Sequence, residues 1–338
     1  MKTHVAQIRE RAPRISVVVP TFRRPVLLRR CLDALLAQRI DPEAFEIIVV
    51  DDGNDDRARD LVRGIAEWIR APRVGYLRPL HGHGPAAARN RGWRAAKGAL
   101  IAFTDDDGIP APDWLLDGAH AFESNRHWVA LSGRVDEPSL DALPLPRRHE
   151  RISPGLEIGE FVAANAFVWR AALEAVGGFD ERFTRAWRDD SDLQFKLLAQ
   201  GAAVGFCPEA CVVHPVQTET VGFILRQQRN TYFDALLYKK HPHLYRERIH
   251  RLPPWDDYLV VAFALAAPLA WLAEADYLAV GSAAVAAALV LRLAWQRLRG
   301  TDLSLVRLLE MLAASALVPF LSVYWRVRGA LRFRVLFL

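Results

Sequence analysis

Three consecutive carboxylates, Asp105 to Asp107, follow the short apolar run from Ala99 to Phe103. Such a charge-free run is typical of a buried strand in a parallel sheet, and ligands of open α/β sheets bind where those strands end. Adjacent carboxylates repel one another, and a hard cation such as Mg²⁺ or Mn²⁺ offsets that repulsion by binding their oxygens. Taken alone, the triplet predicts either a cation site or an acidic turn at the start of a helix.

Further polar side chains follow other apolar runs. Asp51 and Asp52 come directly after the run from Glu46 to Val50, and His214 follows the last β-branched run before residue 215. If these runs are parallel strands of one sheet, their polar ends meet at the same edge. Asp is also a common turn and capping residue, so the two acids alone do not identify a site.

Three further candidates, an acid pair and an arginine, lie near the starts of predicted helices and not at the ends of strands. Asp189 and Asp190 precede residues with helical spacing, and Arg89 lies early in the helix predicted after the glycine loop at His81 to Gly84. A helix start attracts phosphate, and a guanidinium there strengthens that preference. The glycine loop is not a dinucleotide fingerprint, because it is incomplete and does not follow the first strand.

The elements that position these residues alternate along the first hundred residues. Apolar and β-branched runs predict strands, and stretches with helical apolar spacing lie between them. This alternation is typical of a mostly parallel, Rossmann-like sheet flanked by helices. The predicted strands are Ile15–Pro20, Glu46–Val50, Val74–Leu77 and Ala99–Phe103, and the predicted helices carry residues 27–36, 61–68 and 86–97.

The pattern is less regular after Pro112. Four Pro residues within Asp136 to Gly155 predict a loop that could act as a lid. Cys207 and Cys211 are spaced like zinc ligands, but no second pair follows, so buried hydrophobic positions are favoured. The other elements predicted are a helix at 114–116, strands at 129–135, 161–169, 204–207 and 211–213, a helix at 171–176 and a helix from 189.

Composition predicts a globular chain of about two domains. The 338 residues are 51% hydrophobic and 25% charged. The net charge is +5, with 44 basic and 39 acidic residues. Basic residues gather in the apolar C-terminal part, which favours a membrane surface over nucleic acid. We expect a catalytic domain over 1–250 and a hydrophobic helical region over 251–338.

Three apolar segments make up that C-terminal region, at Leu259–Ala273, Tyr277–Leu291 and Leu303–Trp325. The first two are shorter than the roughly 20 residues of a perpendicular span. Acids lie between them and arginines follow the second, so the positive-inside rule predicts a hairpin with cytoplasmic ends. The third segment predicts an interfacial or re-entrant helix. The alternative is a hydrophobic helical domain that packs on the sheet or forms a dimer.

Together, these motifs resemble glycosyltransferase family 2, the inverting nucleotide-sugar transferases of GT-A fold. The resemblance covers roughly residues 14 to 240. Six stretches in the family's order carry it, which makes it far more specific than any one of them. They are SVVVPTFRRPVLLRRCLDALLAQ (Ser16–Gln38), EIIVVDDG (Glu46–Gly53), GPAAARNRG (Gly84–Gly92), IAFTDDDGIPAPDWL (Ile101–Leu115), VGGFDERF (Val176–Phe183) and DDSDLQFKLLAQG (Asp189–Gly201).

The resemblance implies where the donor binds. One carboxylate of Asp51 and Asp52 would accept the N3–H of uracil or thymine, and Arg89 would contact the diphosphate. Asp107 would bind a divalent metal, and Asp105 the ribose or the metal through water. The donor-binding residues so implied are Pro20, Thr21, Arg23, Asp51, Asp52, Arg89, Asp105 and Asp106, and the metal-binding residues are Asp107, Asp105 and His214.

The resemblance also implies the catalytic and acceptor residues. Asp190 matches the second acid of the family's Glu-Asp pair and is the expected catalytic base. Asp189 stands where the family usually has Glu, so its reach is one methylene shorter. Trp187 and Asn165 are expected on the acceptor side.

The implied activity is the inverting transfer of a sugar from a UDP- or dTDP-sugar, with Mn²⁺ or Mg²⁺ as cofactor. The acceptor would be a hydroxyl of a lipid-linked or cell-envelope glycan, at the cytoplasmic face of a bacterial membrane, with no nucleic-acid partner. The alternative is a catalytically inactive nucleotide-sugar-binding subunit of a membrane complex. The intact D-x-D motif and acid pair favour the enzyme.

Overall fold

The computed structural model describes residues 14–136, 161–214, 221–299 and 304–337. They form two compact units, the first from residues 14–136 and 161–214 and the second from the C-terminal helices. Apart from its first residue, the predicted loop from Asp136 to Gly155 lies outside the described residues.

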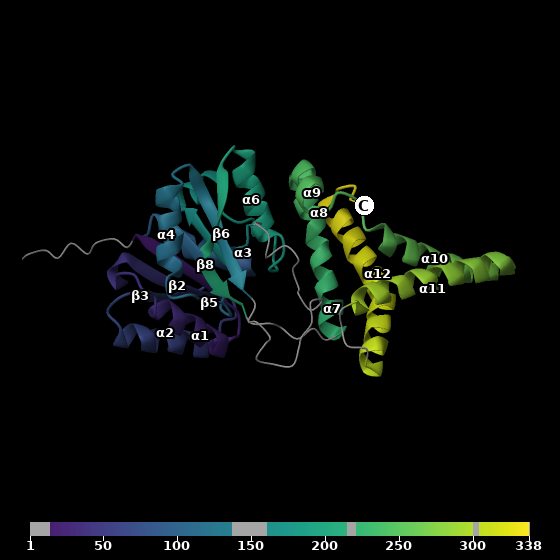
Figure 1. Ribbon diagram of the computed structural model, residues 1–338, viewed down its shortest axis with the longest axis horizontal. Helices are drawn as coiled ribbons and strands as arrows, with labels where there is room; N and C mark the ends of the chain where they lie inside the picture. The colour runs from purple at the N-terminus through teal and green to yellow at the C-terminus, as the bar shows by residue number, and fades with distance from the viewer. Residues whose placement is uncertain (1–13, 137–160, 215–220, 300–303, 338) are drawn as a thin grey trace, which may run out of the picture. The chain divides into compact units, whose positions relative to one another are not determined.

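The first unit contains one eight-stranded sheet in the order β3-β2-β1-β4-β7-β6-β8-β5 (Figure 1). Strands β3, β2, β1 and β4 pair in parallel. Strand β7 runs antiparallel to β4 and β6, while β8 is parallel to β6. The predicted α/β fold with a mostly parallel sheet is confirmed. The elements of the parallel half are β1 (Ile15–Thr21), α1 (Pro25–Leu36), β2 (Phe45–Asp51), α2 (Asp56–Trp68), β3 (Arg73–Leu77), α3 (Pro85–Ala95) and β4 (Leu100–Thr104).

Alternating side chains of the sheet enter two apolar layers. Val17 and Val19 of β1 pack with residues of α1, α2 and α4, while Val18 packs with residues of α3, α5 and α6. Because successive side chains of a strand point to opposite faces, a fully apolar strand fills both layers at once. The remaining elements are β5 (Ile109–Pro110), α4 (Trp114–Ser124), β6 (Trp128–Asp136), β7 (Asn165–Trp169), α5 (Arg170–Val176), α6 (Asp189–Ala199) and β8 (Ala203–Val213).

Strand β8 differs from its prediction. Two separate strands were expected. Instead, one strand runs through both ranges, and a bulge between them interrupts its pairing with β6. Gly133 pairs with Cys207 and Arg134 pairs with Cys211, so residues 208–210 have no partner in β6. Pro208 and Glu209 are exposed in the bulge and look like a loop in the sequence. Both cysteines are buried free thiols, as expected.

The second unit is helical. Helices α10 and α11 lie side by side, and α12 packs against α8 (Figure 1). The unit also contains α7 and α8, which pack with α12. Its helices are α7 (Val221–Gln227), α8 (Thr231–Lys240), α9 (Pro242–Arg248), α10 (Trp255–Leu272), α11 (Asp276–Leu298) and α12 (Leu305–Phe333).

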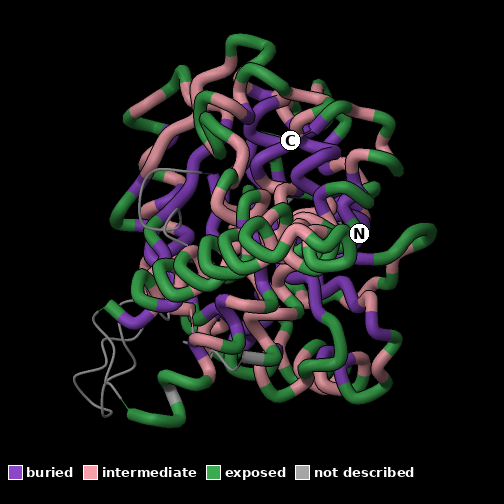
Figure 2. The backbone as a smooth tube through the Cα atoms, turned by 90° about the vertical axis from the view of Figure 1, so that its right-hand side faces the viewer, coloured by how far each residue is buried: buried purple, intermediate pink, exposed green. Residues whose placement is uncertain are grey.

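Three of these helices are long and apolar enough to cross a membrane, judged by length and composition. In α10 and α11 only 6% of the apolar window is buried, against 33% in α12. Figure 2 shows long helical stretches coloured as exposed. The helices exceed the apolar runs in the sequence because charged residues such as Asp256 and Arg297 continue the helical turns. Helix α12, expected to be interfacial or re-entrant, also meets the criterion.

Candidate active site

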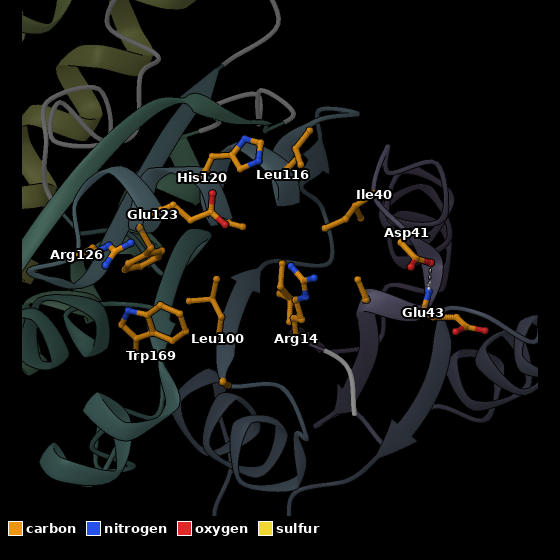
Figure 3. Close-up of a pocket in the computed structure, with 15 residues that line it drawn as sticks. Arg14, Ile40, Asp41, Glu43, Leu100, Leu116, His120, Glu123, Arg126 and Trp169 are labelled. Carbon is orange, nitrogen blue, oxygen red and sulfur yellow. Dashed lines mark hydrogen bonds between the residues drawn. The ribbon is translucent and has the colours of Figure 1, made fainter. Parts of the chain in front are cut away.

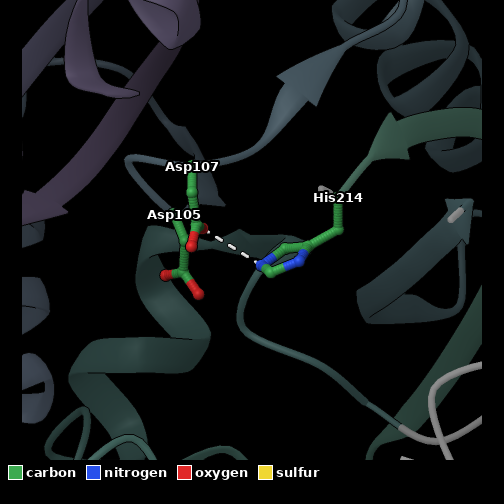
Figure 4. Close-up of side chains that lie close together, drawn as sticks. All are labelled: Asp105, Asp107 and His214. Atoms are coloured by element: carbon green, nitrogen blue, oxygen red, sulfur yellow. Dashed lines mark ion pairs between the residues drawn. The ribbon is translucent and has the colours of Figure 1, made fainter. Parts of the chain in front are cut away.

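The carboxyl ends of β1, β2, β4 and β8 meet at one edge of the sheet, because these strands share one direction. Asp105 and Asp107 follow β4 there, and His214 follows β8. Each offers one ligand atom, and the three atoms lie within 4.8 Å of one another. Figure 4 shows the two carboxylates beside the imidazole. Two carboxylates with one imidazole are a donor set that fits Mn²⁺ or Mg²⁺.

Both oxygens of Asp107 have cationic or polar neighbours. His214 Nε2 lies 3.0 Å from Oδ1, and Arg24 Nη1 donates to Oδ2 at 3.0 Å. Burial alone would raise the pKa of Asp107, but the hydrogen bond and charge of His214, followed by the charge of Arg24, outweigh it and lower the pKa. Asp107 is therefore held as a carboxylate.

Asp106 lies behind this pair. The Thr21 hydroxyl donates to Asp106 Oδ2 at 2.7 Å, and Arg24 Nη1 lies 3.5 Å from Oδ1. Burial raises the pKa of Asp106 to about 6, and the Thr21 hydrogen bond opposes that rise. The middle acid thus ties β1 to the turn after β4.

A buried arginine links the two acidic groups of the site. Arg89, on α3, donates from Nη2 to Asp105 Oδ1 at 2.7 Å and from Nη1 to Asp189 Oδ2 at 2.6 Å. Its side chain is only 3% exposed. Burial disfavours the charge, but Asp105 and Asp189 outweigh it and raise the pKa of Arg89. The guanidinium is thus shared between two carboxylates, and its contact with the donor diphosphate stays a prediction.

Asp189 and Asp190 begin α6, where the helix N-terminus favours negative charge. Asp189 is buried, whereas Asp190 is partly exposed and its Oδ1 accepts the Ser191 N–H at 2.7 Å. Burial raises the pKa of both acids, although Arg89 opposes the rise. Of the two, Asp190 is the acid that a substrate can approach.

The two acids after β2 differ in their burial and in their hydrogen-bond partners. Asp51 is buried, and its oxygens accept the N–H groups of Gly53 at 2.8 Å and Asp55 at 2.7 Å, together with the Tyr76 hydroxyl at 2.8 Å. Asp52 is partly exposed and its Oδ2 accepts the N–H of Gly84 at 2.8 Å. Asp51 thus shapes the turn, and Asp52 joins it to the start of α3.

The remaining predicted donor residues lie at the end of β1. Pro20 is buried within the strand. Arg23 is exposed, with a left-handed φ of 56°, and its guanidinium lies 5.3 Å from the Phe22 ring centre. The neighbouring Arg24 contacts the acids of the candidate metal site. We did not predict a role for Arg24, and the only sequence signal for it is its place beside a strand end.

The two predicted acceptor residues behave differently. Trp187 is partly exposed, with the Arg188 guanidinium 4.7 Å from its ring centre. Asn165 is 0% exposed. Its amide donates to the carbonyls of Arg134 and Ala210, both at 2.8 Å, and accepts from Trp114 Nε1 at 2.8 Å. Asn165 thus joins three segments of the first unit by hydrogen bonds, and its acceptor contact stays a prediction.

A separate cavity of about 1030 Å³ lies at the opposite edge of the sheet, where β1 and β4 begin (Figure 3). Its lining includes Ile15, Leu100 and Trp169 together with His120 and Glu123 of α4. None of the predicted site residues lines it. The candidate active site is therefore the carboxyl edge.

The sequence and fold of this chain are similar to those of known proteins. The family model described as Glycosyl transferase family 2 matches residues 16–177. Validoxylamine A glucosyltransferase of Streptomyces hygroscopicus subsp. limoneus is 32% identical over 222 residues, which are 56% of this chain and 49% of that protein. The chain spans about half the length of the first curated relatives that it matches.

Another relative is matched over more of its length. Galactofuranosyltransferase GlfT1 of Mycolicibacterium smegmatis is 30% identical over 237 residues, covering 65% of this chain and 76% of that protein. Among solved structures, the mannosyltransferase PcManGT of Pyrobaculum calidifontis, in complex with GDP-Man and Mn²⁺, has a TM-score of 0.55 at 21% identity, over 95% of this chain and 87% of that one. That likeness concerns the fold. On the family match and the coverage of its relatives, the chain belongs to glycosyl transferase family 2.

Proposed function

We propose that this protein is a metal-dependent, inverting glycosyltransferase that uses a nucleotide-sugar donor. One observation carries the proposal. Arg89 joins Asp105 of the candidate metal site to Asp189 at the start of α6, with contacts of 2.7 and 2.6 Å. The donor side and the proposed base side are thus one connected set of charges. A surface acidic turn has no need of a buried guanidinium shared in this way.

Asp107, Asp105 and His214 would hold the cation. When bound, a divalent cation stabilises the negative charge that develops on the departing diphosphate. Asp107 is suited to this role because its pKa is lowered, so it remains a carboxylate. Arg89 Nη2 donates to Asp105 Oδ1 at 2.7 Å, which holds that carboxylate in place beside Asp107.

Asp52 is our proposed contact for the nucleoside base. Asp51 already accepts three hydrogen bonds within the fold, while Asp52 is partly exposed. A carboxylate accepts the N3–H of uracil or thymine, which favours UDP- or dTDP-sugars. The nucleoside would then lie beside Pro20, Thr21 and Arg23.

Asp190 is the proposed catalytic base. It would take the proton of an acceptor hydroxyl while that oxygen bonds to the anomeric carbon. The bond from that carbon to the diphosphate breaks on the opposite face, so the configuration inverts and a nucleoside diphosphate leaves. A carboxylate with a raised pKa suits this task, because its proton affinity is closer to that needed at neutral pH. Asp189, paired with Arg89, would position it.

The acceptor is proposed to be a lipid-linked or cell-envelope glycan at the cytoplasmic face of a bacterial membrane. Two observations support this. Three helices of the second unit are long and apolar enough to cross a membrane, and relatives include a poly(ribitol-phosphate) β-glucosyltransferase and a galactofuranosyltransferase. In this scheme residues 1–250 perform the transfer, and residues 251–338 attach the enzyme to the membrane.

The test is a screen of UDP-, dTDP- and GDP-sugars with Mn²⁺ or Mg²⁺, using membrane lipid extract as acceptor. We expect cation-dependent turnover that falls at least about a hundredfold in Asp107→Asn and in Asp190→Asn. Asp190→Asn should still bind the donor. The control Asp33→Asn alters an exposed acid paired with Arg29 and should retain activity. Turnover by Asp190→Asn at the wild-type rate would refute the base assignment.

A further inference from the structure

Arg24 is a second cation of the candidate metal site, and its surroundings differ from those of Arg89. It is the residue immediately before α1. Its Nη1 lies 3.0 Å from Asp107 Oδ2 and 3.5 Å from Asp106 Oδ1. The side chain is 48% exposed, whereas both carboxylates are nearly buried. Arg24 therefore reaches in from solvent to acids that are fixed in the fold.

An exposed arginine can leave such a contact at little cost. Its long side chain regains rotamer freedom, and its half-exposed guanidinium regains water, so its release costs less than the release of a buried arginine. Arg89 lacks this freedom, because it is buried between two carboxylates. Of the two arginines, Arg24 is the one that the site can release.

Arg24 and a divalent cation need the same carboxylate. The other oxygen of Asp107 is 3.0 Å from His214 Nε2, which is itself one of the three candidate ligands. A cation among Asp105, Asp107 and His214 therefore meets the positive charge of Arg24 on the far oxygen of Asp107. Like charges on one carboxylate weaken each other's binding.

We propose that Arg24 is a displaceable counter-ion of the metal site, which couples cation binding to donor binding. The inference rests on the proposed function, because it takes the three ligands and the diphosphate donor from there. Arg24 lowers the affinity of the site for a cation alone. An anionic diphosphate offers the released guanidinium another partner, so cation and donor bind together more tightly than either does alone.

The test is a titration of the purified full-length protein with Mn²⁺, with and without UDP, following free Mn²⁺ by electron paramagnetic resonance. In Arg24→Gln we expect Mn²⁺ alone to bind roughly threefold to tenfold more tightly than in the wild type. UDP should strengthen Mn²⁺ binding less in this variant than in the wild type. Arg24→Lys, which keeps the charge, should behave more like the wild type.

Arg29→Gln is the matched control. Arg29 lies on α1, the helix that follows Arg24, but its partner is Asp33 at 2.8 Å on the surface, so its loss should leave Mn²⁺ affinity unchanged. Melting curves of all variants establish that the fold is intact. If Arg24→Gln binds Mn²⁺ no more tightly than the wild type, the counter-ion role is overturned. If it binds more tightly but UDP helps equally in both, the coupling is overturned.

Asp107→Asn separates this inference from the proposed function. Its Mn²⁺ binding should be lost at concentrations that saturate the wild type. Equal Mn²⁺ binding by Asp107→Asn and the wild type would remove the metal site of the proposed function, whatever Arg24 does. Loss of binding in Asp107→Asn, with no gain in Arg24→Gln, would leave that site standing and reject the counter-ion alone.

Discussion

The arrangement of charge at the carboxyl edge depends on single residues. Among them, we expect the replacement of Arg89 to reduce stability most. Its replacement by Gln would leave Asp189 and Asp105 without their guanidinium, and Asp189 is buried. Breaking a buried pair by removing one partner is costly, so we expect the free energy of unfolding to fall by roughly 2–4 kcal/mol. Chemical denaturation in detergent, followed by tryptophan fluorescence, measures it.

Arg94→Gln is the control for that experiment. Arg94 lies on the same helix, is half-exposed and pairs with Glu181 at 3.3 Å. Such a surface pair contributes little, so the loss should stay below about 1 kcal/mol. A loss below about 1 kcal/mol in Arg89→Gln, as in the control, would mean that the buried Arg89 contacts add little to stability.

The acid pair at the start of α6 predicts a pH dependence. A general base works when deprotonated, and burial raises the pKa of Asp190 and Asp189 above the ordinary carboxyl value. Activity should therefore fall, as the pH drops, at a higher pH than a normal Asp would give. In Asp189→Asn the neighbouring negative charge is gone, so the acid limb of the kcat/KM profile should move to lower pH. A limb that stays or moves up would contradict this assignment.

The sequence predicted which residues lie at the site, but it did not predict which of them contact one another. The motifs placed Asp105, Asp107 and His214 at strand ends, and the structure brings them together. The sequence could not say that Arg89 faces two acids instead of solvent. Nor could it distinguish the adjacent Arg23 and Arg24, of which Arg24 contacts the acids in the structure.

At the scale of elements, local pattern predicted most strands because parallel strands are apolar on both faces. The hydrophobic pattern did not predict strands that exist only through backbone pairing with a neighbouring strand. Strand β5 has only two residues, Ile109 and Pro110, and exists because they pair with Val213 and Val212. No periodicity can be measured over two positions.

The turn after α5 packs closely against α3, and glycine substitutions there test how much this contact contributes to stability. Gly177 and Gly178 both have left-handed φ, 75° and 70°. A Cβ on Gly178 would lie 2.5 Å from Asn90 Oδ1, which accepts hydrogen bonds from Trp93 and Phe179, whereas a Cβ on Gly177 would meet nothing within 4 Å. Gly178→Ala should cost about 2–5 kcal/mol of stability, and Gly177→Ala about 1–2 kcal/mol.

Thermal unfolding of the two glycine variants, side by side, checks this prediction. Both substitutions carry the same backbone strain, so the difference between their midpoints isolates the steric conflict with Asn90. Equal midpoints would show that the turn moves away from α3 without cost.

At the scale of the whole molecule, the apolar surface of the second unit is its main feature. Leu265 of α10 and Val285 of α11 are 55% and 40% exposed. An aspartate near the centre of a membrane-spanning helix costs about 3 kcal/mol or more. Leu265→Asp and Val285→Asp should therefore each reduce, several-fold, the share of full-length protein that remains in membranes after a carbonate wash.

Trp68→Asp is the control for the membrane experiment. Trp68 is 89% exposed, but it is an isolated apolar residue at the end of α2 in the first unit. Isolated exposed apolar residues are common on soluble surfaces. Its substitution should leave the membrane fraction unchanged, and a comparable loss in all three variants would contradict attachment through α10 and α11.

The bulge in β8 determines to which face of the sheet each later side chain of that strand points. Cys207 and Val212 belong to the same apolar layer although they are an odd number of residues apart, because residues 208–210 have no partner in β6. Asn165 bonds the Ala210 carbonyl inside this irregularity. In an unbroken strand the alternation beyond Cys207 would be inverted, and His214 would leave on the other side of the sheet. The buried Asn165 amide thus contacts the irregularity that determines on which side of the sheet the His214 imidazole lies.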